Sequence, residues 1–433
     1  MSGGAGPGAG AGREHVVVLH RWRDRHARYT SYLDHATTYV TYVSTELGLS
    51  SVPEEAAAVR LVPATDRLPE VRAALEALVA EFGPASRLVA LNEGDLDTAA
   101  ELRAAFGLPG QTPGGLDRFR DKLTMVRHVE AAGVPVPRSA DAGSAEDVRR
   151  FAAEHGWPVV VKPRRGTASR GVLVLHGEAD LTAHADVFGP ELREPRIVQS
   201  FVADPVLHLD GLWTGDGLGP WRAARYLNSC EEFTKGTFLG SIELDDPELL
   251  GPLGEFTARA AAALGDGEPW VFHMEAFLGS GPDGTPHPVF LEAGSRVGGA
   301  EIPFVWREVH GLDLMAAAVD IQLGRAPEAT PVTPDEPAAT AGWLLLPLPV
   351  PPPCRVTGAS WDREGSEGGP YAHVVPEPGS LIPQVGGYEH VGGRFRFRGA
   401  SGQEVEAAIR KTAGSFALDC EPLTPDAPRP AGP

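Results

Sequence analysis

The chain has 433 residues and a formal net charge of −20. Its length exceeds the ~100 to 200 residues of one ordinary domain, so two or three lobes with a buried core are expected. The negative charge argues against nucleic acid or an anionic membrane as the main partner, because both attract clustered Lys and Arg. No apolar stretch approaches the ~20 residues of a membrane span, and residues 1–12 lack the apolar core of a secretion signal, so a cytoplasmic protein is expected.

The first part of the chain alternates short apolar runs with amphipathic segments. Strands are predicted over 15–19, 59–62 and 88–91, and helices over 68–81 and 98–106. This alternation is typical of a parallel α/β lobe, which we assign to residues 13–115. Residues 1–12 are rich in Gly and Ala and are predicted to be disordered.

A Gly- and Pro-rich segment at 108–115 separates this lobe from the next. An amphipathic helix is then predicted from Leu116 to a stop at Gly133, which prolines follow. Ser144 is predicted to cap a second helix over 145–155. Strands alternate with a helix over 248–264 in the segment that follows.

The last part of the chain begins after a Pro-, Thr- and acid-rich linker at 326–339. Short strands with glycine turns, and a helix over 404–412, predict a β-rich C-terminal subdomain at 340–418. A disordered tail is predicted at 419–433. The three cysteines, Cys230, Cys354 and Cys420, are far apart and lack metal-binding spacing, so they are expected to be thiols in a reducing compartment.

A basic, glycine-bounded loop follows a short strand that carries Lys162. Gly166 and Gly171 bound the loop and let backbone N–H groups approach phosphate oxygens, while Arg164, Arg165 and Arg170 supply positive charge. A nucleotide triphosphate fits such a place. An ordinary solvated turn is the alternative for so short a pattern.

Two acidic strands flank a turn centred on Asp283-Gly284, which predicts a β-hairpin. Glu275 and Glu292 lie equally far from this turn, so they should face each other across the strands. Opposed carboxylates repel unless a cation lies between them, and oxygen ligands beside a triphosphate suit Mg²⁺. We therefore predict that both are metal ligands; a hairpin with two merely solvated acids is the alternative.

These features together resemble the ATP-grasp superfamily, and more narrowly its carboxylate–amine ligases, such as the L-amino-acid ligases that make dipeptides. The resemblance rests on Lys122 in the first helix, Lys162 before the glycine loop, and two acidic strands that end in Glu292-x-x-x-Arg296. It implies an α/β fold with α+β lobes: an N-terminal parallel α/β lobe, a small lid lobe, a central antiparallel-sheet lobe and the C-terminal β-rich subdomain. The ATP-grasp domain would span 116–325, with the lid lobe at 116–202 and the metal and substrate lobe at 203–325.

The resemblance also implies roles for single residues. Lys122 and Lys162 match the lysines that bind the α- and β-phosphates, and Arg296, which an extended strand would place on the face of Glu292, matches an arginine that holds the reacting intermediate. Lys162 and Arg296 are thus the expected catalytic residues, and His208, Arg225 and Arg296 are substrate candidates. The expected ATP-binding set is Lys122, Lys162, Arg165, Gly166, Thr167, Ser169, Gly171, Gln199, Ser200, Phe201, Val202 and Asp204. In this set, backbone groups of residues 200–202 would bind the adenine edge and Asp204 the ribose.

The chain departs from the family pattern at three positions. Val206 stands where many relatives carry an acid for the ribose, Gly294 where an asparagine metal ligand is frequent, and Gln199 where a glutamate is common. Water can replace a neutral oxygen ligand of Mg²⁺, so a site with two carboxylates is compatible with activity.

The implied function is an ATP-dependent carbon–nitrogen ligase that forms ADP. A substrate carboxylate would attack the γ-phosphate of ATP to give an acyl phosphate, and an amine would displace phosphate. The expected cofactors are ATP and Mg²⁺ or Mn²⁺, and the expected partners are a small carboxylate and an amine, with a homodimer possible. Acyl transfer to a carrier-protein thiol, or ATP binding with little catalysis, are the alternatives.

Overall fold

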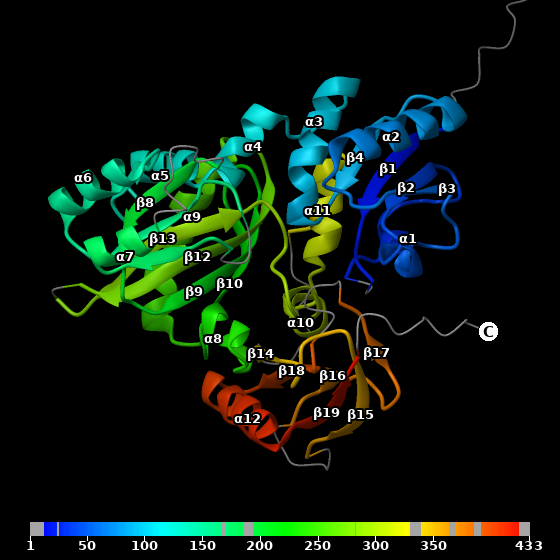
Figure 1. Ribbon diagram of the computed structural model, residues 1–433. Helices are drawn as coiled ribbons and strands as arrows, with labels where there is room; N and C mark the ends of the chain where they lie inside the picture. The colour runs from blue at the N-terminus through cyan, green and yellow to red at the C-terminus, as the bar shows by residue number, and fades with distance from the viewer. Residues whose placement is uncertain are drawn as a thin grey trace, which may run out of the picture. The chain divides into compact units, whose positions relative to one another are not determined.

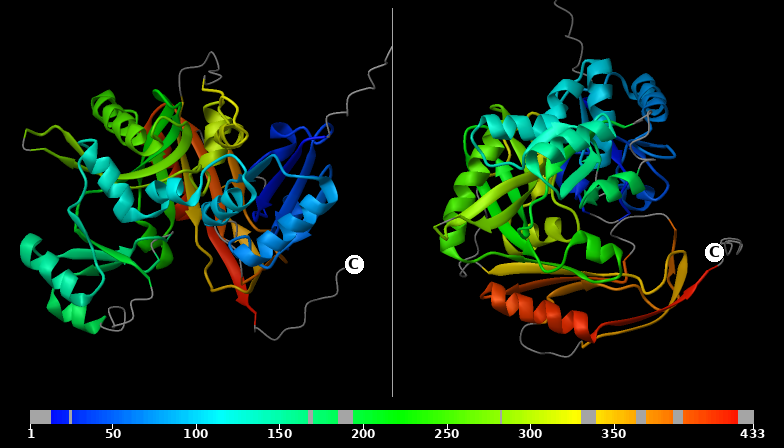
Figure 2. Two further views of the ribbon diagram at one scale, coloured as in Figure 1. Left: turned by 90° about the horizontal axis from the view of Figure 1, so that it is seen from above. Right: turned by 60° about the vertical axis from the view of Figure 1, so that its left-hand side comes forward.

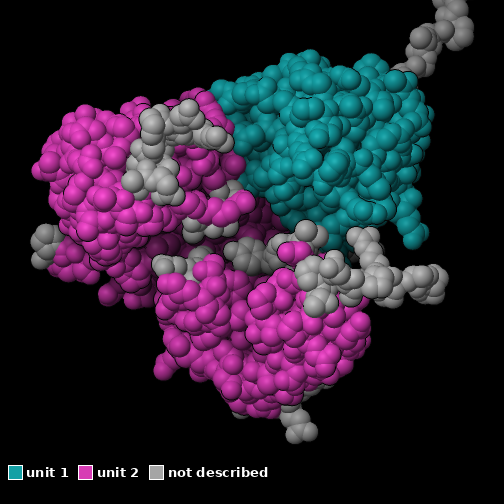
Figure 3. All heavy atoms as spheres, viewed as in Figure 1, with its two compact units in different colours: residues 1–116, 319–326 teal, residues 117–318, 327–433 magenta. Residues whose placement is uncertain are grey.

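The computed structural model describes residues 13–23, 26–166, 170–184, 194–281, 283–329, 339–362, 369–384 and 391–423 (Figure 1). The chain forms two compact units. Unit 1 contains residues 1–116 and 319–326, and unit 2 contains residues 117–318 and 327–433 (Figure 3). No helix in the described part is long and apolar enough to cross a membrane.

Unit 1 is built on a four-stranded parallel sheet with the order β3-β2-β1-β4. Its main elements are β1 His15–His20, α1 Tyr29–Tyr32, β2 Tyr39–Ser44, β3 Ala58–Leu61, α2 Leu68–Phe82, β4 Arg87–Ala90 and α3 Leu96–Phe106. Apolar residues of α2 and α3, including Leu75 and Leu102, pack with Val17 of β1 in one core. The predicted α/β lobe is therefore present.

The strand β2 is missing from the elements that the sequence predicts. Its run Tyr39-Val-Thr-Tyr-Val is rich in β-branched and aromatic residues, which favour strands. β2 pairs with both β1 and β3, so it is an interior strand. Its residues Val40 to Ser44 are all buried, which fits a parallel sheet covered on both faces.

The C-terminal end of α11, Leu314–Gln322, belongs to unit 1. Gln322 Nε2 donates to Ala90 O at 2.9 Å, and Gln322 Oε1 accepts from Ala90 N at 2.9 Å. The buried Arg103 donates to the same Oε1 at 2.8 Å. These bonds hold the end of α11 in unit 1, so the predicted domain end at residue 325 lies too far along the chain. The sequence could not reveal this, because pairing between such distant segments leaves no local pattern.

Unit 2 contains a small antiparallel sheet, the lid sheet, with the order β5-β8-β6-β7. Its strands are β5 Ser139–Asp141, β6 Val159–Pro163, β7 Leu173–Leu175 and β8 Arg196–Ser200, and its helices are α6 Ala145–His155 and α7 Glu178–Ala183. Val159, Val161 and Val198 pack against Phe151 of α6. Because side chains alternate along a strand, Lys162 and Gln199 lie on the other face. Ser144 caps α6 as predicted, by accepting from Asp147 N at 3.2 Å.

The helix predicted from Leu116 to Gly133 is in fact two helices, α4 Pro113–Arg120 and α5 Lys122–Ala131. Asp121 separates them. Its Oδ1 accepts from Leu123 N at 3.1 Å and from Thr124 N at 3.0 Å, which satisfies N–H groups at the start of α5. Lys122 therefore occupies the first position of α5 rather than the middle of a long helix.

The main sheet of unit 2, the large sheet, has eight strands in the order β13-β12-β9-β10-β11-β14-β18-β16. All of its neighbouring strands are antiparallel. They are β9 Val206–Trp213, β10 Leu218–Tyr226, β11 Leu239–Glu243, β12 Trp270–Ser280, β13 Pro286–Gly294, β14 Thr340–Leu346, β16 Ala372–Val374 and β18 Gly393–Gly399. The remaining helices of unit 2 are α8 Cys230–Thr234, α9 Pro247–Gly265, α10 Ile302–Val309 and α12 Gly402–Ser415.

The C-terminal region is rich in strands, as predicted, and several of these strands join the large sheet. β14 pairs with β11, and β18 pairs with β14, so the C-terminal strands extend the large sheet. α12 lies along these strands (Figure 2). A further sheet joins β15 Cys354–Ser360, β17 Leu381–Ile382 and β19 Ala417–Pro422. Residues 419–422 therefore pair in β19 and are not a disordered tail; residues 1–12 and 424–433 lie outside the described part.

The two faces of the large sheet differ in character. Glu292, Glu275, His208, Ala224 and Glu243 are successive cross-strand partners from β13 to β11, so their side chains share one face, the polar face. The opposite face packs against α9 and α12. The hairpin predicted around Asp283-Gly284 is present as β12 and β13.

Candidate nucleotide and metal site

Glu275 and Glu292 are directly opposed across β12 and β13, as the sequence predicts, although the strands between them and the turn pair one residue out of the predicted register. A β-bulge follows Glu275, and such bulges are common beside functional sites. Burial and the neighbouring Glu292 raise the pKa of Glu275, while Tyr226 donates a hydrogen bond to its Oε1 at 3.1 Å. Burial acts in the same direction on Glu292, but Lys122 and Lys162 outweigh it and lower the pKa of Glu292.

Two lysines from separate elements converge on Glu292. Lys122, at the start of α5, has its Nζ 3.1 Å from Glu292 Oε2 and donates to Gly166 O at 3.2 Å. Lys162 is the next-to-last residue of the lid-sheet strand β6 and is only 5% exposed. Burial lowers its pKa, and the charges of Glu292 and Glu275 oppose that shift. The structure thus brings together Lys122, Lys162, Glu275 and Glu292.

This donor set suits a divalent cation. Two opposed carboxylates supply hard oxygen ligands, and the raised pKa of Glu275 reflects a repulsion that a cation between the two groups would relieve. The two lysines lie on the same side, where the charge of a polyphosphate would be neutralised. The residues present therefore fit a magnesium–nucleotide complex.

Two arginines of the basic loop form ion pairs with aspartates of the chain. Arg164 forms an ion pair with Asp121, N to O 2.8 Å, and another with Asp141 at 3.1 Å. Arg165, predicted to bind ATP, forms an ion pair with Asp117. These pairs fix the start of the loop to the α4–α5 junction. Two further predicted ATP-binding residues, Thr167 and Ser169, lie outside the described residues.

Gly171 closes the loop in a conformation that favours glycine. Its φ is +71°, and a Cβ there would lie 3.1 Å from Pro163 Cγ, which is a tight contact. Gly166 shows neither constraint; its carbonyl accepts the hydrogen bond from Lys122 instead.

The predicted adenine-binding segment follows β8. Ser200 N donates to Arg138 O at 3.0 Å, and Phe201 N donates to Pro158 O at 3.4 Å, so these two N–H groups of the segment already have acceptors. Val202 N makes no backbone hydrogen bond within the described chain and stays a candidate donor. The Phe201 side chain is 42% exposed and offers an apolar surface for a ring.

Gln199 and Asp204, also predicted to bind ATP, lie in different surroundings. Gln199 is buried and donates from Nε2 to Ser139 Oγ at 2.9 Å, within the lid sheet. Asp204 lies against β12, since a Cβ on Gly279 would be 2.5 Å from Asp204 Oδ2. Gly279 is four residues from Glu275 on this strand, which places Asp204 at a distance from the metal pair.

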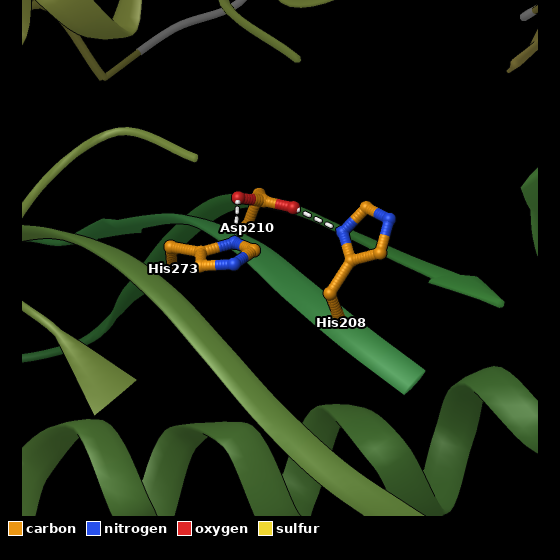
Figure 4. Close-up of side chains that lie close together, drawn as sticks. All are labelled: His208, Asp210 and His273. Atoms are coloured by element: carbon orange, nitrogen blue, oxygen red, sulfur yellow. Dashed lines mark hydrogen bonds and ion pairs between the residues drawn. The ribbon is translucent and has the colours of Figure 1, made fainter. Parts of the chain in front are cut away.

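A hydrogen-bonded cluster continues the polar face beyond Glu275 (Figure 4). Asp210 accepts from His208 Nδ1 at 2.6 Å and from His273 Nδ1 at 2.9 Å. His208 Nε2 is 2.6 Å from Ser241 Oγ. Burial opposes ionisation of Asp210, but the two imidazoles outweigh it and hold the pKa of this carboxyl well below its usual range.

His208 was predicted as a substrate residue, whereas His273 was not. His208 is the cross-strand partner of Glu275, so it lies beside the metal pair. His273 precedes Glu275 by two residues and thus shares its face. This spacing of two is the signal that could have identified His273.

Two predictions about arginines need correction. Arg225 forms an ion pair with Glu406 of α12, and therefore lies on the face opposite to Glu275 and cannot line this site. β13 ends at Gly294, so Arg296 lies in a bend after the strand and does not share a strand face with Glu292. Its guanidinium nevertheless helps to lower the pKa of Glu292, and it donates to Val297 O at 3.0 Å.

Comparisons with known proteins match part of the sequence and the fold. Residues 121–188, which include both lysines and the basic loop, match the family model described as carbamoyl-phosphate synthase L chain, ATP binding domain. The chain is 31% identical over 124 residues to the carbamoyl phosphate synthase large chain of Kocuria rhizophila, a match that covers 28% of this chain and 11% of that protein. The matches to the first curated relatives cover a quarter of their length or less.

Solved structures resemble the chain over almost its whole length. The L-amino acid ligase from Bacillus licheniformis aligns with a TM-score of 0.66 and 17% identity, covering 94% of this chain and 99% of the ligase. The biotin carboxylase domain of the Hydrogenobacter thermophilus 2-oxoglutarate carboxylase, solved with MgADP, ADP and bicarbonate, aligns with a TM-score of 0.66 and 15% identity, covering 94% of this chain and 91% of that domain. At such identities the likeness establishes the fold. The matched ATP-binding segment and the shared fold are in line with the resemblance to the ATP-grasp superfamily.

Proposed function

We propose that the chain is an ADP-forming ligase that activates a small carboxylate as an acyl phosphate and joins it to an amine. One observation carries this proposal: Lys122 and the buried Lys162 meet the opposed pair Glu275 and Glu292 at one place in unit 2. Groups that would bind a polyphosphate and its cation are thus adjacent. The partial sequence match to a carbamoyl phosphate synthase and the fold shared with an L-amino acid ligase support this proposal.

The proposed roles follow from charge and position. Lys122 and Lys162 would neutralise phosphate oxygens, and Glu275 and Glu292 would hold Mg²⁺ or Mn²⁺. The metal ion, when bound, would offset the negative charge that develops on the transferring phosphoryl group. Arg296, which lies near Glu292, would hold the substrate carboxylate through its planar guanidinium. Val202 N and the exposed Phe201 ring would bind adenine.

The chemistry explains why ATP is needed. A free carboxylate is a poor acylating agent because oxide is a poor leaving group, and phosphorylation converts that oxide into a good leaving group. The basic loop, whose start is fixed by the pairs of Arg164 and Arg165 with acids, would cover the site and exclude the water that hydrolyses acyl phosphates. Acyl transfer to a thiol and ATP binding without turnover are the competing possibilities, and a cytoplasmic location stays a prediction.

A pairwise substrate screen tests the proposal. The purified chain is incubated with ATP, Mg²⁺ and pairs of small acids and amines, and ADP, AMP and phosphate are measured while the products are weighed by mass spectrometry. We expect ADP and phosphate in equal amounts, released only with a suitable pair, and a product lighter than the two substrates by one water. Release of AMP would contradict the acyl-phosphate route. Nucleotide binding without release for any pair would favour a non-catalytic protein.

A further inference from the structure

A methionine sulfur contacts the strand that carries Glu292. Met125 of α5 is 2% exposed, and its Sδ accepts a hydrogen bond from Ala293 N at 3.2 Å. Ala293 is buried as well and follows Glu292 directly in the chain. A buried backbone N–H group therefore has a side-chain sulfur as its acceptor, next to a proposed metal ligand.

This hydrogen bond covers part of the outer edge of the large sheet. β13 is an end strand, so its outward N–H groups have no neighbouring strand to accept their hydrogen bonds. Phe290 N donates instead to Pro135 O at 2.8 Å, and Ala293 N donates to the sulfur of Met125. A thioether sulfur is a weak acceptor on an otherwise apolar, unbranched side chain, so it can satisfy an N–H group without bringing a strongly polar atom into the core. Leucine would fill a similar space and leave that N–H group without an acceptor.

The sulfur and the ion pair of Lys122 attach α5 to β13 at two points. Lys122 and Met125 are three residues apart, so they lie on one side of the helix. Their partners, Glu292 and Ala293, are neighbours on β13. In the described part of the chain, no other side chain of α5 forms a hydrogen bond or an ion pair with β13. Two points fix both the rotation of the helix and its position along the strand, which one long and flexible lysine cannot do.

We propose that Met125 is a positioning residue that keeps Lys122 in register with Glu292 when a nucleotide binds. This inference rests on the proposed function, in which Lys122 neutralises a phosphate and Glu292 holds the metal ion. Both groups would then exchange their mutual ion pair for contacts with the ligand, so the hydrogen bond of Met125 becomes the polar side-chain contact that still joins α5 to β13. The sulfur carries no charge, so the ligand does not compete for it. Lys122 therefore reaches the phosphate from a helix whose position stays fixed.

The contact can be tested without any ligand. Met125→Leu keeps an apolar side chain of similar size but removes the acceptor, and cores tolerate such volume-conserving changes best. Hydrogen–deuterium exchange, measured by mass spectrometry on a peptide of residues 286–294, should be about threefold to tenfold faster in this variant. A peptide of residues 207–213, from β9, should exchange at the natural rate. Met315→Leu is the matched control, because Met315 is 3% exposed and its sulfur has no hydrogen bond in the described part of the chain.

A double-mutant cycle tests whether Met125 acts through Lys122. Calorimetry measures the dissociation constant of a non-hydrolysable ATP analogue with Mg²⁺ for the natural chain, Met125→Leu, Lys122→Ala and the double variant. We expect Met125→Leu to raise this constant about threefold to tenfold in the natural chain, but less than about twofold when residue 122 is already Ala. A purely structural effect of the sulfur would raise the constant by the same factor in both backgrounds. Met315→Leu should leave it unchanged.

The outcomes separate this inference from the proposed function. Unchanged exchange of residues 286–294 in Met125→Leu overturns it, as do equal factors in the two backgrounds of the cycle. If Met125→Leu fails to fold, Met125→Gln decides, because its amide oxygen can accept from Ala293 N: a dissociation constant within about twofold of the natural one supports the inference, and a larger rise contradicts it. If exchange and cycle agree with the inference but no substrate pair releases ADP, the positioning role stands and the ligase proposal fails.

Discussion

Glu292 receives more opposite charge than any other acid of the candidate site. Its carboxylate is 3.1 Å from Lys122, and the charges of Lys162 and Arg296 also lower its pKa. Its opposed partner Glu275 instead has a raised pKa, so the two acids differ although they face each other. Glu292 is thus the carboxylate that stays ionised most readily and can hold a cation.

Replacing Glu292 by Gln should abolish turnover and leave the fold intact. Gln keeps the size of the side chain but removes the charge that a metal ion needs, so activity is expected to fall at least ~100-fold, which corresponds to about 2.7 kcal/mol of transition-state stabilisation. ADP release and circular dichroism measure the two properties. Glu248→Gln, an exposed change on α9, is the control. Near-normal activity of Glu292→Gln would remove the metal assignment.

Lys162→Ala should act mainly on nucleotide affinity. A charge-assisted hydrogen bond contributes about 1.5 to 3 kcal/mol, so the dissociation constant of a non-hydrolysable ATP analogue is expected to rise tenfold to about a hundredfold. Isothermal titration calorimetry measures the constant. Lys411→Ala, an exposed lysine on α12, should leave it unchanged. Equal affinities in both variants would contradict the phosphate-binding role of Lys162.

Asp210 gives a prediction about pH. Its pKa is lowered in the folded chain by His273 and His208, so its ionised form stabilises the fold above the usual aspartate pKa of 3.8, and this contribution disappears as the pH falls below that value. Asp210→Asn should therefore reduce the free energy of unfolding at pH 7, by about 3 to 5 kcal/mol for a broken buried pair. Chemical denaturation should show that Asp210→Asn lowers the free energy of unfolding, relative to the natural chain, less at pH 3 than at pH 7. A difference that is independent of pH would contradict this assignment.

Candidate site residues were easier to predict from the sequence than the face of the sheet on which each one lies. Counting outward from the turn as a reference pairs Glu275 with Glu292, but the register beside the turn differs by one residue from this count, and it is the bulge after Glu275 that brings the two acids opposite each other. Arg225 was misplaced because the start of β10 has no such reference, and a shift of one residue moves a side chain to the other face. Arg222, three positions earlier, lies on the polar face instead.

At the scale of the element, the start of α5 is the most consequential feature. Asp121 caps this helix and also holds Arg164, so a single carboxylate orients Lys122 and anchors the basic loop. A helix predicted from apolar periodicity continues through Asp121, because the apolar spacing continues from α4 into α5. The break is visible only through the cap, which Asp favours.

Asp121→Ala should weaken both the helix and the site. Loss of an N-cap costs roughly 1 kcal/mol of stability, and the freed Arg164 and Lys122 should raise the dissociation constant for ATP several-fold. Ser144→Ala is the matched control, since Ser144 caps α6 in the same way and contacts no predicted phosphate-binding residue. Urea denaturation should show similar losses in both variants, and calorimetry should show weaker ATP binding only in Asp121→Ala. Unchanged binding would mean that the cap has no part in orienting Lys122.

At the scale of the whole molecule, the order of lobes was predictable and their boundaries were not. Alternating strands and helices identified the α/β lobe, and two lysine motifs followed by an acidic hairpin identified the nucleotide-binding part. The pairing of β11 with β14 joins segments about a hundred residues apart, and no local pattern records such a pairing. The C-terminal region was for this reason taken as a separate subdomain.

This continuity of the large sheet makes a final prediction about truncation. A chain that ends at residue 338 would lose β14 and expose the backbone edge of β11, whose residues Leu239–Glu243 are all buried. Exposed apolar strand edges promote aggregation, so this chain should precipitate or lack a cooperative thermal transition. A chain that ends at Leu423 keeps every described strand and should melt like the full chain in differential scanning fluorimetry. An independent C-terminal subdomain would instead leave the chain of 338 residues folded with its ATP affinity intact, because Lys122, Lys162, Glu275 and Glu292 all precede the cut.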